Sequence, residues 1–266
     1  MLLYDKKLFS LFLLNTLFIL LITIPVSAAA SPDSPATTSE KALRILREID
    51  DLYRSTSSFS NLTMQVQTKH YTRTVRMEGW SKGKEKSLVK ILYPLKEKGT
   101  TTLKSGSNIY TYLPKTDRTI RLTSGMMMAS WMGSHFTNDD LVKESRLADD
   151  YDPAITFEGE RDGLQVIDFM LIPKPDAPVV WGKIILTIGA ADHLPLVSRY
   201  FDEDAVLART LIFSNIKNLG GRDLPTVLRV IPADKEEEYT ELIYENINFD
   251  IKLDDSFFSL MQLRRK

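Results

Sequence analysis

The first run of apolar residues in this chain recurs every three or four positions: Leu43, Leu46, Ile49, Leu52 and Tyr53. This spacing is typical of one face of an amphipathic helix. Ser39 stands immediately before the run and suits an N-cap, because a serine there accepts a hydrogen bond from a backbone N–H of the first turn. The pattern predicts a helix over residues 40–55.

From Phe59 onward the apolar spacing changes to two, as Leu62, Met64 and Val66 alternate with polar residues. Many short apolar runs follow, bounded by Gly, Pro or Asp, which is typical of strands joined by turns. They form two series, before and after residues 123–141, and number about a dozen. So many strands predict one wide, curved antiparallel sheet or barrel. No repeat of fixed period is present, which disfavours propellers and solenoids.

The segment between the two series, residues 123–141, reads TSGMMMASWMGSHFTNDDL and is very apolar for a connection. It contains four of the nine methionines of the chain. Its large apolar residues are Met126, Met127, Met128, Trp131, Met132 and Phe136. At its end, Thr137 and Asp140 have the spacing of a capping box, which predicts a helix that starts there.

Two interpretations of this segment stay open: a helix that plugs one end of a barrel as ordinary core, or a mobile lid over an apolar cavity for a lipid-like guest. Methionine suits a lid because it tolerates irregular, changeable contacts. Trp80, Tyr110 and Tyr112 lie on predicted strands, and we expect them to line a cavity, since so many strands enclose more volume than side chains fill. The predicted ligand-binding set is these three aromatic residues and the six apolar residues of the segment.

The N-terminus has the three parts of a secretory signal peptide. Lys6 and Lys7 precede an uncharged, mostly apolar run over residues 8–24, which is followed by Pro25 and the letters VSAAAS. The run also reaches the low end of the length of a membrane-spanning helix, but its alanine-rich end favours cleavage. We therefore predict a signal peptide over residues 1–28, a Pro/Ser/Thr spacer over residues 29–38, and a single domain over residues 39–266 of an exported protein.

Composition excludes several classes of function. The chain has no cysteine, so disulfides and thiol nucleophiles are absent. Its formal net charge is −1 and no basic block stands out, which argues against a nucleic-acid partner. No nucleophile elbow, zinc helix, Walker loop or dinucleotide fingerprint is present. We expect no enzyme activity, no cofactor and no metal.

His135 and Asp139 are the one pair with a spacing that suits a metal, because residues four apart share a helix face. Catalytic metal sites generally need three protein ligands, however, and no third is visible. The alternative is that Asp139 and Asp140 favour the positive end of a helix and that His135 is a polar neighbour. We expect this structural role.

The order of segments over nearly the whole chain resembles the LolA/LolB-like superfamily of outer-membrane lipoprotein-sorting proteins of the bacterial periplasm. The residues that carry the resemblance are Gly79, Trp80, Pro94, Gly106, Tyr110, Tyr112 and Pro114. The letters SWMGSHFTNDDL are similar to a largely uncharacterised LolA-like branch, in which an acidic residue is expected where His135 stands. The resemblance implies a mainly β fold with a few α-helices, in which an incompletely closed antiparallel β-barrel is covered by a helical lid.

In LolA that cavity accepts the acyl chains of lipoproteins released by an inner-membrane transporter, and passes them to an outer-membrane receptor. The resemblance therefore implies a periplasmic carrier or chaperone for lipoprotein or lipid cargo, with an inner-membrane transporter and an outer-membrane acceptor as partners. One alternative is an accessory module that docks on an inner-membrane transporter and takes no guest. Another is a hydrolase that uses His135 with nearby acids.

Overall fold

The computed structural model describes residues 35–143 and 146–264, and most of them belong to one sheet of 13 strands. The first series is β1 (Ser57–Gln67), β2 (Thr72–Lys82), β3 (Lys86–Tyr93), β4 (Thr101–Ser105), β5 (Asn108–Leu113) and β6 (Arg118–Arg121). The second series is β7 (Tyr151–Arg161), β8 (Leu164–Pro173), β9 (Lys183–Gly189), β10 (Pro195–Phe201), β11 (Leu207–Leu219), β12 (Arg222–Pro232) and β13 (Tyr239–Phe249).

The helical elements are few and mostly short. They are α1 (Pro35–Asp50), α2 (Asn138–Lys143), α3 (Leu147–Asp150), α4 (Leu260–Leu263) and the 3₁₀ turns η1 (Ser124–Met126), η2 (Trp131–Gly133) and η3 (Asp255–Phe257). No helix in the described ranges has the length and apolar character needed to cross a membrane. The predicted signal peptide and most of the predicted spacer lie outside the described residues.

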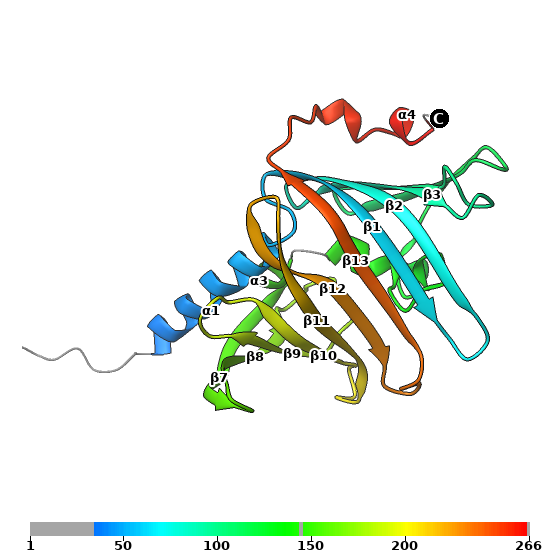
Figure 1. The fold of residues 1–266 in the computed structure, drawn as a ribbon. Coiled ribbons are helices and arrows are strands. Elements are labelled where there is room, and N and C mark those ends of the chain that lie inside the picture. Colours follow the sequence, from blue (N-terminus) through cyan, green and yellow to red (C-terminus); the bar gives the residue numbers. More distant parts are fainter. Residues whose placement is uncertain (1–34, 144–145, 265–266) are drawn as a thin grey trace, which may run out of the picture. The chain divides into compact units, whose positions relative to one another are not determined.

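The strands are ordered β6-β5-β4-β3-β2-β1-β13-β12-β11-β10-β9-β8-β7. Each series is thus a meander in which neighbours in sequence pair antiparallel, and the two meanders join where β1 pairs with β13. The described residues contain no pairing between the edge strands β6 and β7, so the sheet curves without closing (Figure 1). The predicted mainly β fold, an incompletely closed antiparallel barrel, is confirmed.

The sheet buries apolar side chains on both of its faces. Successive residues of a strand point to opposite faces, so Met77 and Trp80 of β2 lie on different sides. We call the face that carries Met77 the inner face and the face that carries Trp80 the outer face. The inner face is covered by α1, α3 and residues 123–143, whereas the outer face of β2–β5 is covered by the C-terminal segment, residues 250–264 (Figure 1).

Helix α1 confirms the predicted amphipathic helix, although its ends differ from the prediction. Ala42, Ile45 and Leu46 are fully buried against the inner face of β8 and β9. The helix begins at Pro35 rather than after Ser39, and proline suits a first turn, where its missing N–H has no partner in any case. It ends at Asp50, so Tyr53 belongs to the turn that follows.

Candidate functional site

A cavity of about 260 Å³ lies between the inner face of the sheet and the segments that cover it. Much of its wall is apolar and comes from strands of both meanders, including Leu62, Met77, Leu211, Leu228, Val230 and Tyr244. Tyr53 closes one side: its ring stacks on Tyr244 with centroids 4.7 Å apart. The Tyr53 hydroxyl also donates a 2.7 Å hydrogen bond to the Pro225 carbonyl. The turn after α1 is thereby fixed to the sheet.

Residues 123–143, which we call the cover segment, form the opposite wall. The segment turns back on itself through an antiparallel bridge between Ser130 and Thr137, and the Trp131 N–H donates to the Phe136 carbonyl at 2.8 Å. This local pairing turns Trp131 and Phe136 toward the cavity. The Trp131 side chain is only 6% exposed.

The end of the cover segment contains the predicted capping box, which is confirmed. The Thr137 N–H donates to Asp140 Oδ2 at 2.7 Å, and the Asp140 N–H donates to Thr137 Oγ1 at 3.3 Å. Helix α2 therefore begins at Asn138, because both of these backbone N–H groups, which lack partners within the helix, find acceptors.

Asp140 also binds the sheet. Arg209 of β11 donates to its two carboxylate oxygens at 2.8 and 2.5 Å, the two-pronged geometry that guanidinium and carboxylate groups favour. The rings of Trp181 and Tyr200 each lie 4.5 Å from the guanidinium carbon. Burial by itself lowers the pKa of the Arg209 guanidinium, but the charge of Asp140 outweighs this and the pKa is raised. The guanidinium group therefore stays charged inside the wall of the cavity.

Further polar contacts hold the middle of the cover segment on the sheet. Arg73 donates to the Met132 carbonyl at 2.8 Å, and the Tyr71 hydroxyl donates to the Gly133 carbonyl at 2.9 Å. The His135 N–H donates to Thr240 Oγ1 at 3.0 Å. The segment is therefore docked at both ends of its bend, and most of these contacts use its backbone.

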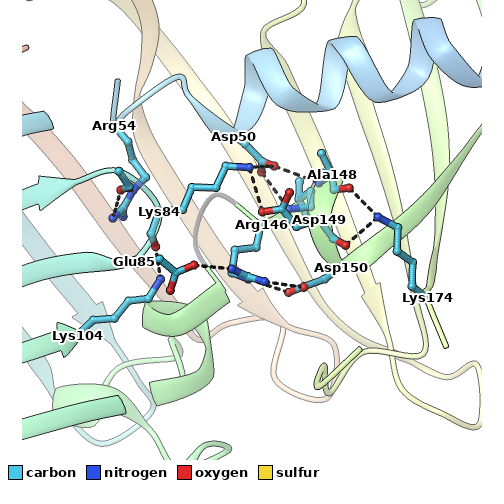
Figure 2. A network of polar contacts seen from close by, with 12 residues as sticks. Asp50, Arg54, Lys84, Glu85, Lys104, Arg146, Ala148, Asp149, Asp150 and Lys174 are labelled. Carbon is cyan, nitrogen blue, oxygen red and sulfur yellow. Dashed lines mark hydrogen bonds and ion pairs between the residues drawn. The ribbon is translucent and has the colours of Figure 1, made fainter. Parts of the chain in front are cut away.

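The polar residues Asp50, Arg146 and Asp150 of the cavity wall belong to a network of contacts that joins α1, the β2–β3 turn and α3 (Figure 2). Asp50, the last residue of α1, accepts hydrogen bonds from the backbone N–H groups of Leu147 and Ala148, each at 3.0 Å. Arg146 donates to both oxygens of Asp150 at 3.1 and 3.2 Å and to Glu85 at 2.8 Å. These contacts join three segments that are far apart in the sequence.

Burial raises the pKa of the Asp50 carboxyl to about 6, although the N–H groups of Ala148 and Leu147 and the nearby Lys84 act in the opposite direction. Lys84 Nζ lies 3.9 Å from Asp50 and 3.0 Å from Asp149. Asp50 is only 2% exposed. The carboxylate is charged at neutral pH, at an energetic cost that the surrounding donors reduce.

The structure brings three of the nine predicted ligand-binding residues to the inner face. Trp131 and Phe136 line the cavity, and Met132 packs beside them on the inner-face core. Met126, Met127 and Met128 do not contribute to the wall, and Met126 and Met128 are 39% and 51% exposed. From this segment it is Trp131 and Phe136, rather than these methionines, that line the cavity.

Trp80, Tyr110 and Tyr112 also lie away from the cavity, because their strand positions point to the outer face. Trp80 aligns with Leu88, Leu103 and Tyr110 across β2–β5, and this row packs under Phe257 and Phe258. Trp80 borders a separate hollow of about 220 Å³ on the outer face. These aromatic residues belong to the core beneath the C-terminal segment.

Sequence reasoning named Asp139 and Asp140 only as residues at the start of a helix, and it missed the other charged residues of the cavity wall: Asp50, Arg146, Asp150 and Arg209. Two of the missed residues leave a signal. Arg209 occupies an inward position in the alternation with Leu211 and Phe213, and an arginine on an apolar face of a strand indicates a special role. Asp50 lies four residues after Leu46, on the apolar face of α1. Their partners, Asp140 and residues 147–148, are not visible from local spacing.

His135 and Asp139 do not form a metal site with a third ligand. Within the described ranges, no group of three or more His, Asp or Glu residues is placed to hold a metal ion. His135 Nδ1 instead lies 2.9 Å from Thr240 Oγ1, and Nε2 lies 3.3 Å from Glu238. These contacts serve to dock the cover segment on β13.

Solved structures with this architecture come from several bacteria. An outer-membrane lipoprotein-sorting protein domain from Vibrio parahaemolyticus aligns with a TM-score of 0.74 at 22% identity, over 85% of this chain and 100% of that one. A DUF1329 family protein from Desulfovibrio piger aligns with a TM-score of 0.75 at 22% identity, over 85% and 99% of the two chains. A LolA superfamily protein from Nitrosomonas europaea aligns with a TM-score of 0.71 at 22% identity, over 83% and 98%.

The fold is therefore that of the LolA-like proteins, and the resemblance drawn from the sequence is confirmed at this level. A family model described only as an uncharacterized protein matches residues 83–265, and the chain belongs to this family. A search of curated proteins gave no match.

Proposed function

We propose that the protein is a periplasmic carrier that binds acylated cargo, either lipoprotein acyl chains or a lipid, in the cavity beneath the cover segment and transports it toward the outer membrane. The observation that carries the proposal is the cavity of about 260 Å³ with a largely apolar wall between the sheet and its cover. A dry apolar cavity of about 150 Å³ is already enough to bind benzene. The larger cavity here suits part of an acyl chain.

The apolar contribution is sufficient for useful affinity. Each buried methylene contributes about 0.8 kcal/mol, and micromolar binding corresponds to about 8 kcal/mol. A chain that buries roughly ten methylenes reaches that figure before the costs of association are subtracted. An acyl chain needs to displace the cover segment only partly, since the segment rests on the sheet through a small number of polar contacts.

The sequence and the fold support export of the carrier and the partners that we propose for it. The apolar N-terminal run and its alanine-rich end support a periplasmic location. A carrier in that compartment would receive cargo from an inner-membrane transporter and deliver it to an outer-membrane acceptor. The neighbour from Vibrio parahaemolyticus is described as a lipoprotein-sorting domain, which supports lipoprotein cargo for this chain.

The proposal is tested with a fluorescent monoacylglycerol titrated into the purified protein below the critical micelle concentration. We expect saturable binding with a dissociation constant in the micromolar range or below. Trp131→Asp should weaken binding at least tenfold, because it places a charge in the apolar wall. Met128→Asp introduces the same charge on the exposed side of the same segment and should leave the affinity unchanged. Absence of binding to the intact protein, or equal effects of the two variants, would overturn the proposal.

A second candidate function is an accessory module that docks on an inner-membrane transporter without taking a guest. The exposure of Met126 and Met128 favours it, because methionine is frequent at adaptable binding surfaces. This candidate predicts that the intact protein binds no acyl probe and that Met128→Asp, rather than Trp131→Asp, removes its activity in the cell.

A further inference from the structure

We propose that the cavity selects its cargo by the charge of the head group, so that it takes acyl chains with neutral or cationic head groups and rejects carboxylate and phosphate head groups. This inference rests on the proposed carrier function and assigns the chemical class of its cargo. An acylated and uncharged lipid anchor fits the rule, whereas free fatty acids and acidic phospholipids do not.

The first observation is the excess of acidic groups in the cavity wall. The charged residues that line it are Asp50, Asp139, Asp140, Asp150, Arg146 and Arg209. Four carboxylates against two guanidinium groups leave this part of the wall with a net charge of −2. Asp50, Asp139 and Asp150 are each at most 5% exposed, so solvent screens them far less than it screens surface charges.

The second observation is that both guanidinium groups already hold carboxylates. Arg209 binds Asp140 through two hydrogen bonds, and Arg146 binds both Asp150 and Glu85. An anionic head group would therefore have to displace a carboxylate of the protein in order to form a two-pronged pair with either guanidinium group. It would do so beside Asp50 and Asp139, whose like charges repel it.

The third observation concerns the Nε–H group of Arg209, which takes no part in the pair with Asp140. This group is buried and has no acceptor in the part of the chain that the structure describes, and a buried donor without a partner is costly. The carbonyl oxygen of an ester or amide, or a hydroxyl oxygen, is an acceptor that adds no charge. A neutral polar head group can thus be accommodated at this wall without breaking the Asp140–Arg209 pair.

The lysine side chains next to this wall do not reverse the sign of its net charge. Lys84 reaches Asp50 at 3.9 Å, but it also pairs with Asp149 at 3.0 Å. Lys174 donates to the backbone carbonyls of Ala148 and Asp149 at 2.9 and 2.7 Å (Figure 2). Each of these cations is already engaged with oxygen acceptors of α1 or α3.

The experiment compares probes that share one fluorescent acyl chain and differ in the head group: a monoacylglycerol, an acylcholine and a lysophosphatidic acid. At pH 7.5 and low salt we expect the lysophosphatidic acid probe to bind at least tenfold more weakly than the monoacylglycerol probe. Asp139→Asn should reduce this ratio about threefold, because it removes one negative charge from the wall. Asp50→Asn is a second variant, which removes a different negative charge from the wall.

Asp162→Asn is the matched control, since it makes the same change in the β7–β8 turn, outside the cavity. It should leave the ratio unchanged. Equal or tighter binding of the lysophosphatidic acid probe would overturn the head-group rule and leave the carrier function standing. If none of the three probes binds, the carrier function itself fails, and the rule fails with it.

Discussion

At the scale of single residues, two buried charged groups link the cover to the sheet. Asp140 caps α2 and at the same time pairs with Arg209, so the start of the helix and its docking depend on one carboxylate. Asp50, at the end of α1, caps α3 in a similar way, because its carboxylate accepts hydrogen bonds from the first two backbone N–H groups of α3. Both carboxylates join elements that are distant in the sequence.

We expect Arg209→Met and Asp140→Asn each to lower the free energy of unfolding by about 3–5 kcal/mol, because each leaves a buried group without its ionic partner. The double variant should regain part of this loss, since it removes both charges. Arg229→Met is the control, because Arg229 is 44% exposed in its pair with Glu241 and such pairs contribute about 0–1 kcal/mol. Urea unfolding of the four variants measures these differences, and equal losses at Arg209 and Arg229 would contradict the role of the buried pair.

Asp50 predicts a specific pH dependence. Its pKa is raised from 3.8 to about 6 in the folded protein, so the folded state binds the proton more tightly than the unfolded state. The raised pKa therefore contributes to the free energy of unfolding. This contribution is fully present below pH 3.8 and is lost as the pH rises through about 6. A shift of about two units corresponds to at most about 3 kcal/mol.

Asp50→Asn removes this titration. The stability of the variant relative to the native protein should therefore increase as the pH is raised from 4.5 to 7, by on the order of 2 kcal/mol. The loss of one acceptor oxygen adds a constant offset that does not depend on pH. Chemical unfolding at several pH values measures the difference, and a difference that stays flat across this window would contradict the raised pKa.

At the scale of elements, local periodicity predicted the helix, the strands and the capping box, because each follows from neighbours in the sequence. Which face of each strand borders the cavity could not be predicted in the same way. Met77 is buried and Trp80 is half-buried, because the C-terminal segment covers the outer face of a sheet that the cover segment covers on the inner face. Alternation shows that two residues lie on different faces, but it does not show which face borders a cavity.

The cover segment shows a second limit. The segment consists of two short turns, η1 and η2, and the Ser130–Thr137 bridge. Inward and outward side chains do not alternate with a regular period in such a segment. Apolar content alone therefore could not separate Trp131, which faces inward, from Met128, which faces solvent. Met132 even adopts a left-handed backbone conformation with φ of 52°, which is uncommon outside glycine. The contacts that dock the middle of the segment on the sheet come from Arg73, Tyr71 and Thr240, which are distant in the sequence.

The separation of the two faces makes a testable prediction at this scale. Phe258→Ala should destabilise the protein by about 3–5 kcal/mol, as is typical for a buried phenylalanine, because Phe258 is 5% exposed under the outer-face row. The folded variant should still bind the monoacylglycerol probe with native affinity. Thermal unfolding and probe titration report the two effects, and a large loss of affinity in the folded variant would mean that the outer face belongs to the site.

At the scale of the whole molecule, an open sheet with separate covers on its two faces differs from a closed, filled barrel. The outer cover packs on an aromatic row beside a hollow of about 220 Å³. The inner cover leaves a cavity whose floor is apolar and whose end is acidic. The same arrangement accounts for the apolar character of residues 123–141: Trp131 and Phe136 form the wall, Met132 packs beside them, and Met126 and Met128 are exposed. The proposed carrier function needs both a stable sheet and a cover that can be displaced, and these two roles would fall to different elements.

The most direct test of the central claim is to map where an acyl chain binds. A monoacylglycerol with a photoreactive diazirine at the end of its chain is crosslinked to the intact protein, and the labelled residues are identified by mass spectrometry. Labelling should fall on the cavity wall, at Trp131, Leu228, Tyr244 or their neighbours, and excess unlabelled monoacylglycerol should compete it away. Labelling that concentrates on Trp80 and Phe257 at the outer face, or that resists competition, would contradict the claim that the inner cavity holds the cargo.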